Sequence, residues 1–237
     1  MRTQIQWEMT SGCTLTIQQD SQKVDGLGGE IWSGGYTLAR FVEKQTMKSS
    51  ENTVIELGAG CGLVGFVLSS LGFPVVLTDA LPELLHENYA LNHKAFASPL
   101  EVQVASLDWE MPLSWPKEWK HNFTLIVGSE ITQLGKELHT PLLNTIDYLL
   151  SSDTKDGQVL LSMDICTPLC VGTCTEKCTS SSFMQKAREK GFSTEIVEKI
   201  PLAEQRDVRS QKGVNGAPVV VDEDDYSIIL RLCRLNI

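Results

Sequence analysis

Three closely spaced glycines form the clearest chemical pattern in the 237-residue sequence. They are Gly58, Gly60 and Gly62, and an apolar run precedes and follows them. Glycine lets the backbone turn sharply and lets a ligand approach without a Cβ in the way. A glycine loop that a strand enters and a helix leaves is typical of nucleotide-binding and related cofactor-binding proteins. The spacing therefore predicts a ligand-binding loop at residues 58–62.

An acidic residue, Glu56, lies two positions before the first of these glycines. A carboxylate there would repel the phosphates of a dinucleotide, because like charges at short range repel strongly in a protein interior. It would instead attract a cationic ligand, such as the amino-acid end of S-adenosylmethionine. We therefore interpret the loop as a site for S-adenosylmethionine rather than for a dinucleotide.

Two more carboxylates follow at informative positions. Asp79 ends the next predicted strand, 19 residues after Gly60, where doubly wound folds place the carboxylate that accepts ribose hydroxyls. Asp108 and Trp109 follow the third predicted strand and could hold an adenine, through its amino group and its ring face respectively. Each feature alone could be structural: a tight turn, a helix N-cap or a solvated loop residue. Their order and spacing together favour the cofactor site.

These residues require an α/β framework to position them. Apolar or alternating segments predict strands at 53–57, 75–79, 100–107, 123–127 and 158–164. Helical spacing and end signals predict helices at 36–44, 63–71, 82–92, 140–150 and 181–190. Strands that alternate with helices indicate a Rossmann-like, doubly wound, mostly parallel sheet. Two final strands, at 195–200 and 226–233, have no helix between them and predict an antiparallel edge.

The N-terminal segment has a different pattern. Residues 4–8 and 14–18 alternate around a Ser-Gly turn, which predicts a β-hairpin outside the main sheet. No internal repeat or linker divides the rest. We therefore expect one domain over 1–237, with a hairpin extension at 1–25 and a cofactor-binding core at 26–237.

Composition restricts the partners. With 42% hydrophobic and 21% charged residues the chain can build a sizeable core, and neither a signal peptide nor a bilayer-length apolar run is visible. The net charge of −10 disfavours nucleic acid and favours a cationic partner such as a Lys/Arg-rich protein surface. We expect a monomer in the cytoplasm, or also the nucleus, with a protein substrate and with no nucleic-acid or membrane partner.

The segment 56–62, Asp79, Asp108-Trp109 and the upstream stretch 29–33 resemble the class I, seven-strand methyltransferases. They are most similar to the subfamily that methylates lysines of non-histone proteins. The resemblance implies a seven-stranded sheet with an antiparallel strand, S-adenosylmethionine as the donor, and direct methyl transfer to a positioned acceptor. It also implies that Trp32, which matches a G-x-x-x-W segment of the subfamily, lines the cofactor pocket.

One motif departs from that subfamily. After the fourth strand its members carry Asp-x-x-Tyr, whereas this chain has Glu130-Ile-Thr-Gln133. Glu130 could orient an acceptor amine and Gln133 could hydrogen-bond one, so we assign both to the acceptor side. Glu130 could equally cap a helix. A small-molecule methyltransferase and a cofactor-binding partner without transfer activity therefore remain as alternatives.

Four cysteines recur every four residues after the predicted strand at 158–164: Cys166, Cys170, Cys174 and Cys178. Four thiolates could bind zinc. However, the spacing differs from the usual C-x2-C, and an intervening proline and glycine disfavour the helix that would align them. We expect loop thiols there and no metal site.

Overall fold

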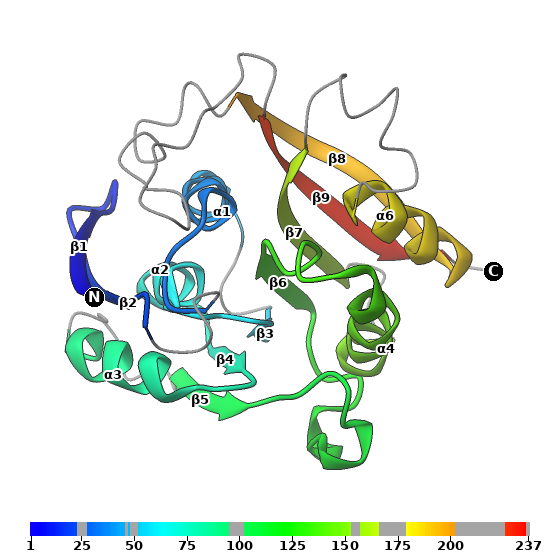
Figure 1. The fold of residues 1–237 in the computed structure, drawn as a ribbon, viewed down its shortest axis with the longest axis horizontal. Coiled ribbons are helices and arrows are strands. Elements are labelled where there is room, and N and C mark those ends of the chain that lie inside the picture. The colour runs from blue at the N-terminus through cyan, green and yellow to red at the C-terminus, as the bar shows by residue number, and fades with distance from the viewer. Residues whose placement is uncertain are drawn as a thin grey trace.

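A seven-stranded sheet with helices on both faces forms the body of the molecule, and a two-stranded hairpin lies outside it (Figure 1). This computed structural model describes residues 1–22, 28–45, 47, 52–94, 102–152, 157–165, 179–201 and 226–235. The cysteine run and most of the polar stretch between the last two predicted strands lie outside these ranges. No helix in the described ranges is long and apolar enough to cross a membrane.

The sheet has the order β5-β4-β3-β6-β7-β9-β8. Its strands are β3 (Val54–Glu56), β4 (Val75–Asp79), β5 (Val102–Ser106), β6 (Leu125–Ser129), β7 (Gln158–Ile165), β8 (Phe192–Pro201) and β9 (Tyr226–Arg234). β3 to β7 are parallel, and β9 runs antiparallel to both β7 and β8. The predicted mostly parallel sheet with an antiparallel edge is confirmed. The chain order reverses at β3, so the carboxyl ends of β3 and β6 flank the crevice where such sheets bind ligands.

Alternating side chains on the strands build a separate core on each face. Val54 packs into the core under α1 (Ser33–Lys44) and α2 (Leu63–Ser70), and Ile55 into the core under α4 (His139–Leu149) and α6 (Thr179–Glu189). β6 repeats the pattern with Val127 and Ile126. Figure 1 shows these helix pairs on opposite sides of the sheet. Burial on both faces explains why the central strands read as continuous apolar runs.

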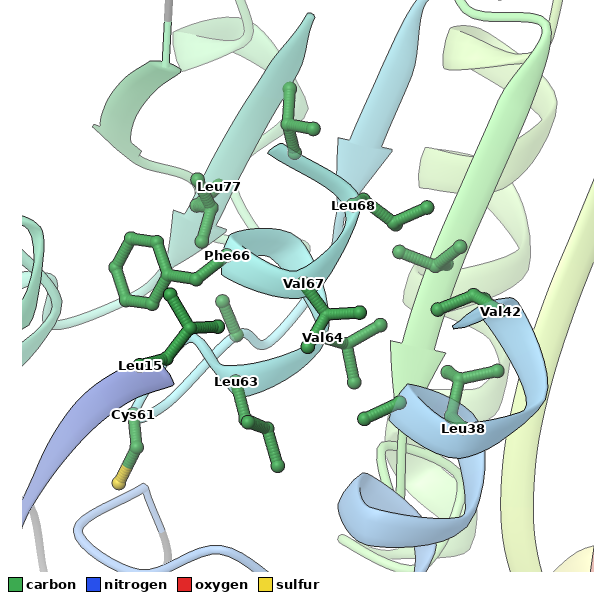
Figure 2. Packing of buried hydrophobic residues seen from close by; sticks show 14 of the residues in the cluster. Leu15, Leu38, Val42, Cys61, Leu63, Val64, Phe66, Val67, Leu68 and Leu77 are labelled. Carbon is green, nitrogen blue, oxygen red and sulfur yellow. The ribbon is translucent and has the colours of Figure 1, made fainter. Parts of the chain in front are cut away.

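The helix that follows the glycine loop is buried almost all round. Every residue of α2 from Leu63 to Ser69 is buried. Figure 2 shows its side chains between Leu38 and Val42 of α1, Leu77 of β4 and Leu15 of the hairpin. Contacts on all sides fix the position of α2, and with it the position of the loop from which the helix starts.

The hairpin docks onto α3 (Glu83–Asn92) through two asparagines. Its strands are β1 (Arg2–Glu8) and β2 (Thr14–Asp20). The Asn92 side chain accepts from Thr16 N–H and donates to Thr16 C=O, and Asn88 makes the same pair of bonds with Gln18. Each amide therefore satisfies one backbone N–H and one backbone C=O of β2, as a neighbouring strand would. The predicted hairpin outside the main sheet is confirmed.

One helix starts earlier than predicted. α1 begins at Ser33, although the glycines at 34 and 35 suggested a loop up to residue 35. A Cβ on Gly34 would lie only 2.2 Å from Glu130 Oε1, so glycine is needed for close contact rather than for a turn. Ser162 Oγ donates to Gly34 C=O at 2.7 Å and holds this first turn against β7.

Candidate active site

A cavity of about 800 Å³ opens at the carboxyl ends of the parallel strands. Its walls come from the loop before α1, the glycine loop, and the ends of β3, β4, β6 and β7. This volume is in the range of sites that enclose a cofactor or drug-sized ligand. All predicted site residues line it except Asp108 and Trp109. The sheet therefore brings together residues that are more than 130 positions apart in the sequence.

The glycine loop has the geometry that its sequence predicts. Gly58, Gly60 and Gly62 have φ angles of 59°, 52° and 85°. This left-handed region is strained for residues with a Cβ. A Cβ on Gly58 would lie 2.7 Å from Ile131 Cγ2, and one on Gly60 would lie 3.0 Å from Gly28 C=O. The loop therefore needs glycine both for its conformation and for the space that it leaves.

Asp79 holds the loop from the end of β4. Its Oδ2 accepts from Gly60 N–H at 2.9 Å and its Oδ1 from Leu81 N–H at 3.1 Å. An ionised carboxylate offers about four acceptor positions, so these two bonds leave capacity for ligand hydroxyls. The position suits the ribose contact that the sequence predicts.

Glu56 lies in the cavity wall but also has a structural partner. Only 1% of the residue is exposed, and its Oε2 accepts from Gly65 N–H of α2 at 2.8 Å. Burial, and secondarily the charge of Asp79, raise the pKa of Glu56 to about 8. Our sequence argument assumed an ionised Glu56. This shift favours the neutral carboxyl, whereas a cation in the cavity would favour its ionised form.

Asp108 and Trp109 lie beside the cavity and not in its lining. The Trp109 ring approaches to 3.4 Å of the Cβ position of Gly58. Asp108 Oδ1 accepts from Glu110 N–H at 2.8 Å, and its backbone C=O accepts from the Trp115 indole at 2.7 Å. The Trp109 indole is thus close to the glycine loop, whereas Asp108 accepts hydrogen bonds from residues that follow it in the chain. Their part in holding an adenine stays a prediction.

Trp32 lines the cavity, and its contact with the cofactor stays a prediction. It precedes the first turn of α1 and lines the cavity while keeping 39% of its surface exposed. An indole in this position offers an apolar surface both to a ligand inside and to a partner outside.

Glu130 combines a cavity position with a capping role. It follows β6 with a φ angle of 57°, which is unusual for a residue other than glycine. Its Oε1 accepts from Gly34 N–H at 2.9 Å, and its Oε2 accepts from Asp164 N–H at 3.4 Å. The carboxyl therefore caps α1, a helix almost one hundred positions earlier in the sequence. Burial, then the nearby charge of Asp164, raise the pKa of Glu130 well above its usual range.

Asp164 is a cavity residue that our sequence reasoning missed. Its two carboxylate oxygens accept from the hydroxyls of Ser33 and Ser227, and its C=O accepts from Gln133 Nε2 at 2.7 Å. A signal was present in the sequence, because Asp164 ends the predicted strand at 158–164. The carboxyl ends of adjacent parallel strands meet at one edge of the sheet, which places Asp164 beside Glu130.

All the acidic or basic side chains in the described lining of the cavity are carboxyl groups. Five carboxyl side chains line it: Glu30, Glu56, Asp79, Glu130 and Asp164. Among the described residues of this lining there is no lysine, arginine or histidine. Such a cavity favours cationic ligands and disfavours phosphates. Within the described ranges, no group of three or more His, Cys, Asp or Glu residues is arranged to hold a metal ion.

Known protein families match this chain over most of its length. A family profile described as lysine methyltransferase matches residues 10–189. The zebrafish (Danio rerio) protein N-lysine methyltransferase METTL21A is 34% identical over 158 residues, which are 64% of this chain and 66% of that protein. EEF1A lysine methyltransferase 3 of Xenopus tropicalis is 30% identical over 146 residues, which are 60% of this chain and 62% of that protein. The chain thus spans slightly less than two thirds of the length of these relatives.

Solved structures share the fold at low sequence identity. The YcgJ protein of Bacillus subtilis superposes with a TM-score of 0.58 at 13% identity, covering 84% of this chain and 98% of that one. Magnesium protoporphyrin IX methyltransferase from Synechocystis, with bound S-adenosylmethionine, gives a TM-score of 0.53 at 13% identity, covering 84% and 77%. These likenesses show that the sheet and its helices follow a fold that other solved proteins share.

Proposed function

The chain belongs to the lysine methyltransferase family, and from that premise we propose that it transfers a methyl group from S-adenosylmethionine to a lysine side chain of a non-histone protein. One observation carries the proposal: a cofactor-sized cavity lined by five carboxyl groups and, among its described lining residues, by no basic side chain. Both substrates of this reaction bring a positive charge to the cavity, because the donor carries a sulfonium and the lysine arrives as an ammonium before it loses a proton.

The donor half of the cavity is at β3 and β4. S-Adenosylmethionine, when bound, supplies an electrophilic methyl group on a positively charged sulfur. Gly58 and Gly60 let the loop pack closely against Ile131 and Gly28, and Asp79 is positioned to accept hydroxyl hydrogen bonds. Glu56 supplies a carboxyl whose ionised form a cation would favour. These residues fit the cofactor that the family uses.

The acceptor half is at β6 and β7. A lysine has a pKa of about 10.4 in water, so it must lose a proton before its nitrogen can attack. Glu130 and Asp164 lie together there and could bind and orient the amine. The Gln133 side chain donates a hydrogen bond to Asp164 C=O and so links the chain after β6 to the end of β7.

The exposed apolar side chains at the rim of the cavity favour a protein acceptor over a small molecule. Trp32 and Leu134 both line the cavity and keep 39% and 41% of their surfaces exposed. Large apolar side chains at a rim suit contact with a polypeptide that covers the opening. The names of the relatives also support a protein acceptor, because one is a protein N-lysine methyltransferase and the other an EEF1A lysine methyltransferase.

We further propose a monomer of the cytoplasm, or also the nucleus, that binds neither nucleic acid nor membranes. The net charge of −10 and the acidic cavity support a cationic protein partner. Sedimentation of the purified protein and localisation of a tagged form would test these points.

Transfer of labelled methyl groups to a cell lysate tests the proposed function. The purified protein would be incubated with a lysate and S-adenosylmethionine labelled in its methyl group. We expect one or a few labelled protein bands, which Asp79→Asn and Glu130→Ala both abolish. Asp147→Asn is the matched control, because Asp147 lies on α4 in a pair with Arg234 and outside the cavity lining. Calorimetric cofactor binding without any labelled protein would contradict the proposal in favour of a small-molecule enzyme or an inactive binding protein.

A further inference from the structure

The acceptor loop, residues 130–133, follows β6 and borders the acceptor half of the cavity. Glu130 and Gln133 at its two ends line the cavity, whereas Thr132 between them is fully buried. A buried backbone C=O needs a hydrogen-bond donor, because an unpaired carbonyl in the interior costs free energy. The imidazole of His139, the first residue of α4, bonds Thr132 C=O through Nε2 at 3.0 Å. A histidine outside the cavity lining therefore holds the loop that carries two of the lining residues.

The chemistry of the partner defines the form of this ring. A carbonyl can only accept, so Nε2 of His139 carries the hydrogen of the bond. Nδ1 is buried and has no hydrogen-bond partner among the described residues. The ring also packs edge-on against Phe183 of α6, with 5.5 Å between the ring centroids. A neutral ring with its hydrogen on Nε2 fits this site, because a second hydrogen on Nδ1 would be buried without an acceptor.

The charged groups near the ring mostly oppose a second proton. Lys136 precedes α4, and Lys186 of α6 donates to Lys136 C=O at 3.2 Å. Burial is the largest cause that lowers the pKa of His139, and the charges of the two lysines act in the same direction. The bond to Thr132 C=O and the charge of Glu137 act in the opposite direction. The neutral ring is thus favoured by the surroundings as well as by the unpaired Nδ1.

We propose that the neutral imidazole of His139 is a positioning group for methyl transfer, because it fixes the acceptor loop and thereby the cavity residues at the two ends of that loop. This role rests on the proposed function. His139 does not line the cavity, so the expected effect is on the geometry of the acceptor half and not on cofactor binding. Protonation would place a positive charge and an unpaired N–H in the buried site, which favours release of the loop.

Two substitutions separate the hydrogen bond from the rest of the side chain. His139→Gln places an amide N–H near the position of Nε2, whereas His139→Leu keeps an apolar body without a donor. For His139→Leu we expect kcat to fall by about tenfold to 100-fold, the scale of a small misplacement remote from the reacting atoms. KM for S-adenosylmethionine should change little, and His139→Gln should restore most of the rate. An equally slow His139→Gln, or a His139→Leu variant as fast as wild type, would overturn the proposal.

Ile146→Val is the matched control for a general loss of stability. Ile146 is fully buried two turns after His139 on α4, about 10 Å farther along the helix axis, and is not in the cavity lining. The substitution removes one buried methyl group and no hydrogen bond, so it weakens the packing of α4 alone. We expect wild-type kcat under conditions where every variant is folded. A loss of kcat equal to that of His139→Leu would assign the effect to the helix and overturn the role of the bond.

The pH dependence gives a readout that an untitratable contact would not move. The ratio of the wild-type rate to the His139→Gln rate cancels the ionisation of the acceptor and of the cavity carboxyls, which both proteins share. Glu130, the titratable residue of the acceptor loop, bonds Gly34 N–H and Asp164 N–H rather than the imidazole. The ratio should be constant above pH 7 and fall at acid pH, where the imidazole of wild type gains a proton. A ratio that rises toward acid pH would mean that the charged ring holds the loop, contrary to the proposal.

Hydrogen exchange tests the contact without any methyl transfer. Gln133 N–H donates to Glu130 C=O at 3.1 Å within the loop, and Glu130 N–H donates to Ser162 C=O at 2.9 Å. At pH 7 both amides should exchange about tenfold faster in His139→Leu, the factor expected for one lost bond to a buried carbonyl, and little faster in His139→Gln or Ile146→Val. Unchanged exchange in His139→Leu would overturn the proposal even in an active enzyme. Faster exchange in that variant of a protein that methylates nothing would instead refute the proposed function and leave the positioning contact standing.

Discussion

At the residue scale, the glycine loop shows how φ and available space jointly select a residue. Gly58 and Gly12 both have positive φ angles, of 59° and 86°. They differ in surroundings, because a Cβ on Gly58 would lie 2.7 Å from Ile131 whereas one on Gly12 would have nothing within 4 Å. The two positions therefore separate conformational strain from steric overlap.

Gly58→Ala should weaken both the fold and the cofactor site. We expect destabilisation of about 2–4 kcal/mol from strain plus overlap, against about 1 kcal/mol for Gly12→Ala from strain alone. Cofactor affinity should fall by about tenfold or more in Gly58→Ala and stay unchanged in Gly12→Ala, since 1.4 kcal/mol corresponds to a factor of ten. Urea unfolding and calorimetry would measure the two effects. Equal affinities in both variants would show that the loop does not contact the cofactor.

Single residues of the donor half were predictable because their signals are local. The spacing of Gly58, Gly60 and Asp79 depends only on a strand, a turn and a helix that are contiguous in the chain. The raised pKa of Glu56 and the contact of Glu130 with the Asp164 backbone were not predictable in the same way. They depend on burial and on contacts between segments that only the folded sheet brings together.

At the element scale, the hairpin and the glycine loop are joined through α3. Asn88 donates to Gln18 C=O and also to Cys61 C=O in the loop, both at 2.9 Å. Asn92, one turn later on the same helix, bonds Thr16 but not the loop. Both asparagines are buried, so they form a matched pair that differs in its contact with the cofactor site.

Substitution of these asparagines should separate hairpin docking from loop support. Asn88→Ala and Asn92→Ala should each destabilise the protein by about 1–2 kcal/mol, because each leaves partly buried backbone groups of β2 without a partner. Only Asn88→Ala should also lower cofactor affinity, by about tenfold. Chemical unfolding and titration calorimetry provide the measurements. If Asn92→Ala weakened cofactor binding as much, the effect would come from the hairpin and not from the bond to Cys61.

The alternation of strands and helices made most elements predictable, including the antiparallel edge. The start of α1 was not, because its two glycines at 34 and 35 resemble a loop. At Gly34 the cause lies in Glu130 and Ser162, which approach the first turn of α1 too closely for a Cβ. A tertiary contact thus outweighed the local preference of glycine for loops.

At the scale of the whole molecule, buried carboxyl groups link stability to pH. Glu56 titrates near 4.5 when unfolded and at about 8 in the folded protein. Between these values the folded state binds more protons than the unfolded state, so the free energy of unfolding falls as pH rises. The raised pKa of Glu130 acts in the same direction.

Glu56→Gln should reduce this dependence. Relative to wild type, the variant should gain stability progressively from pH 5 to pH 8, by up to a few kcal/mol, since one pKa unit corresponds to about 1.4 kcal/mol. Urea unfolding of both proteins at several pH values would give the difference, which cancels groups that titrate in both, such as His139. A difference that stays constant over this range would mean that Glu56 is ionised in the folded protein throughout.

Identification of the methylated amino acid tests the central claim most directly. A protein labelled by wild type, and not by Asp79→Asn, would be isolated from the lysate and hydrolysed to amino acids, and the label would be assigned by chromatography and mass spectrometry. We predict that the label is in methylated lysine. Label in another amino acid, or only in small molecules, would contradict the account of an acidic cavity that binds a lysine ammonium beside a sulfonium donor.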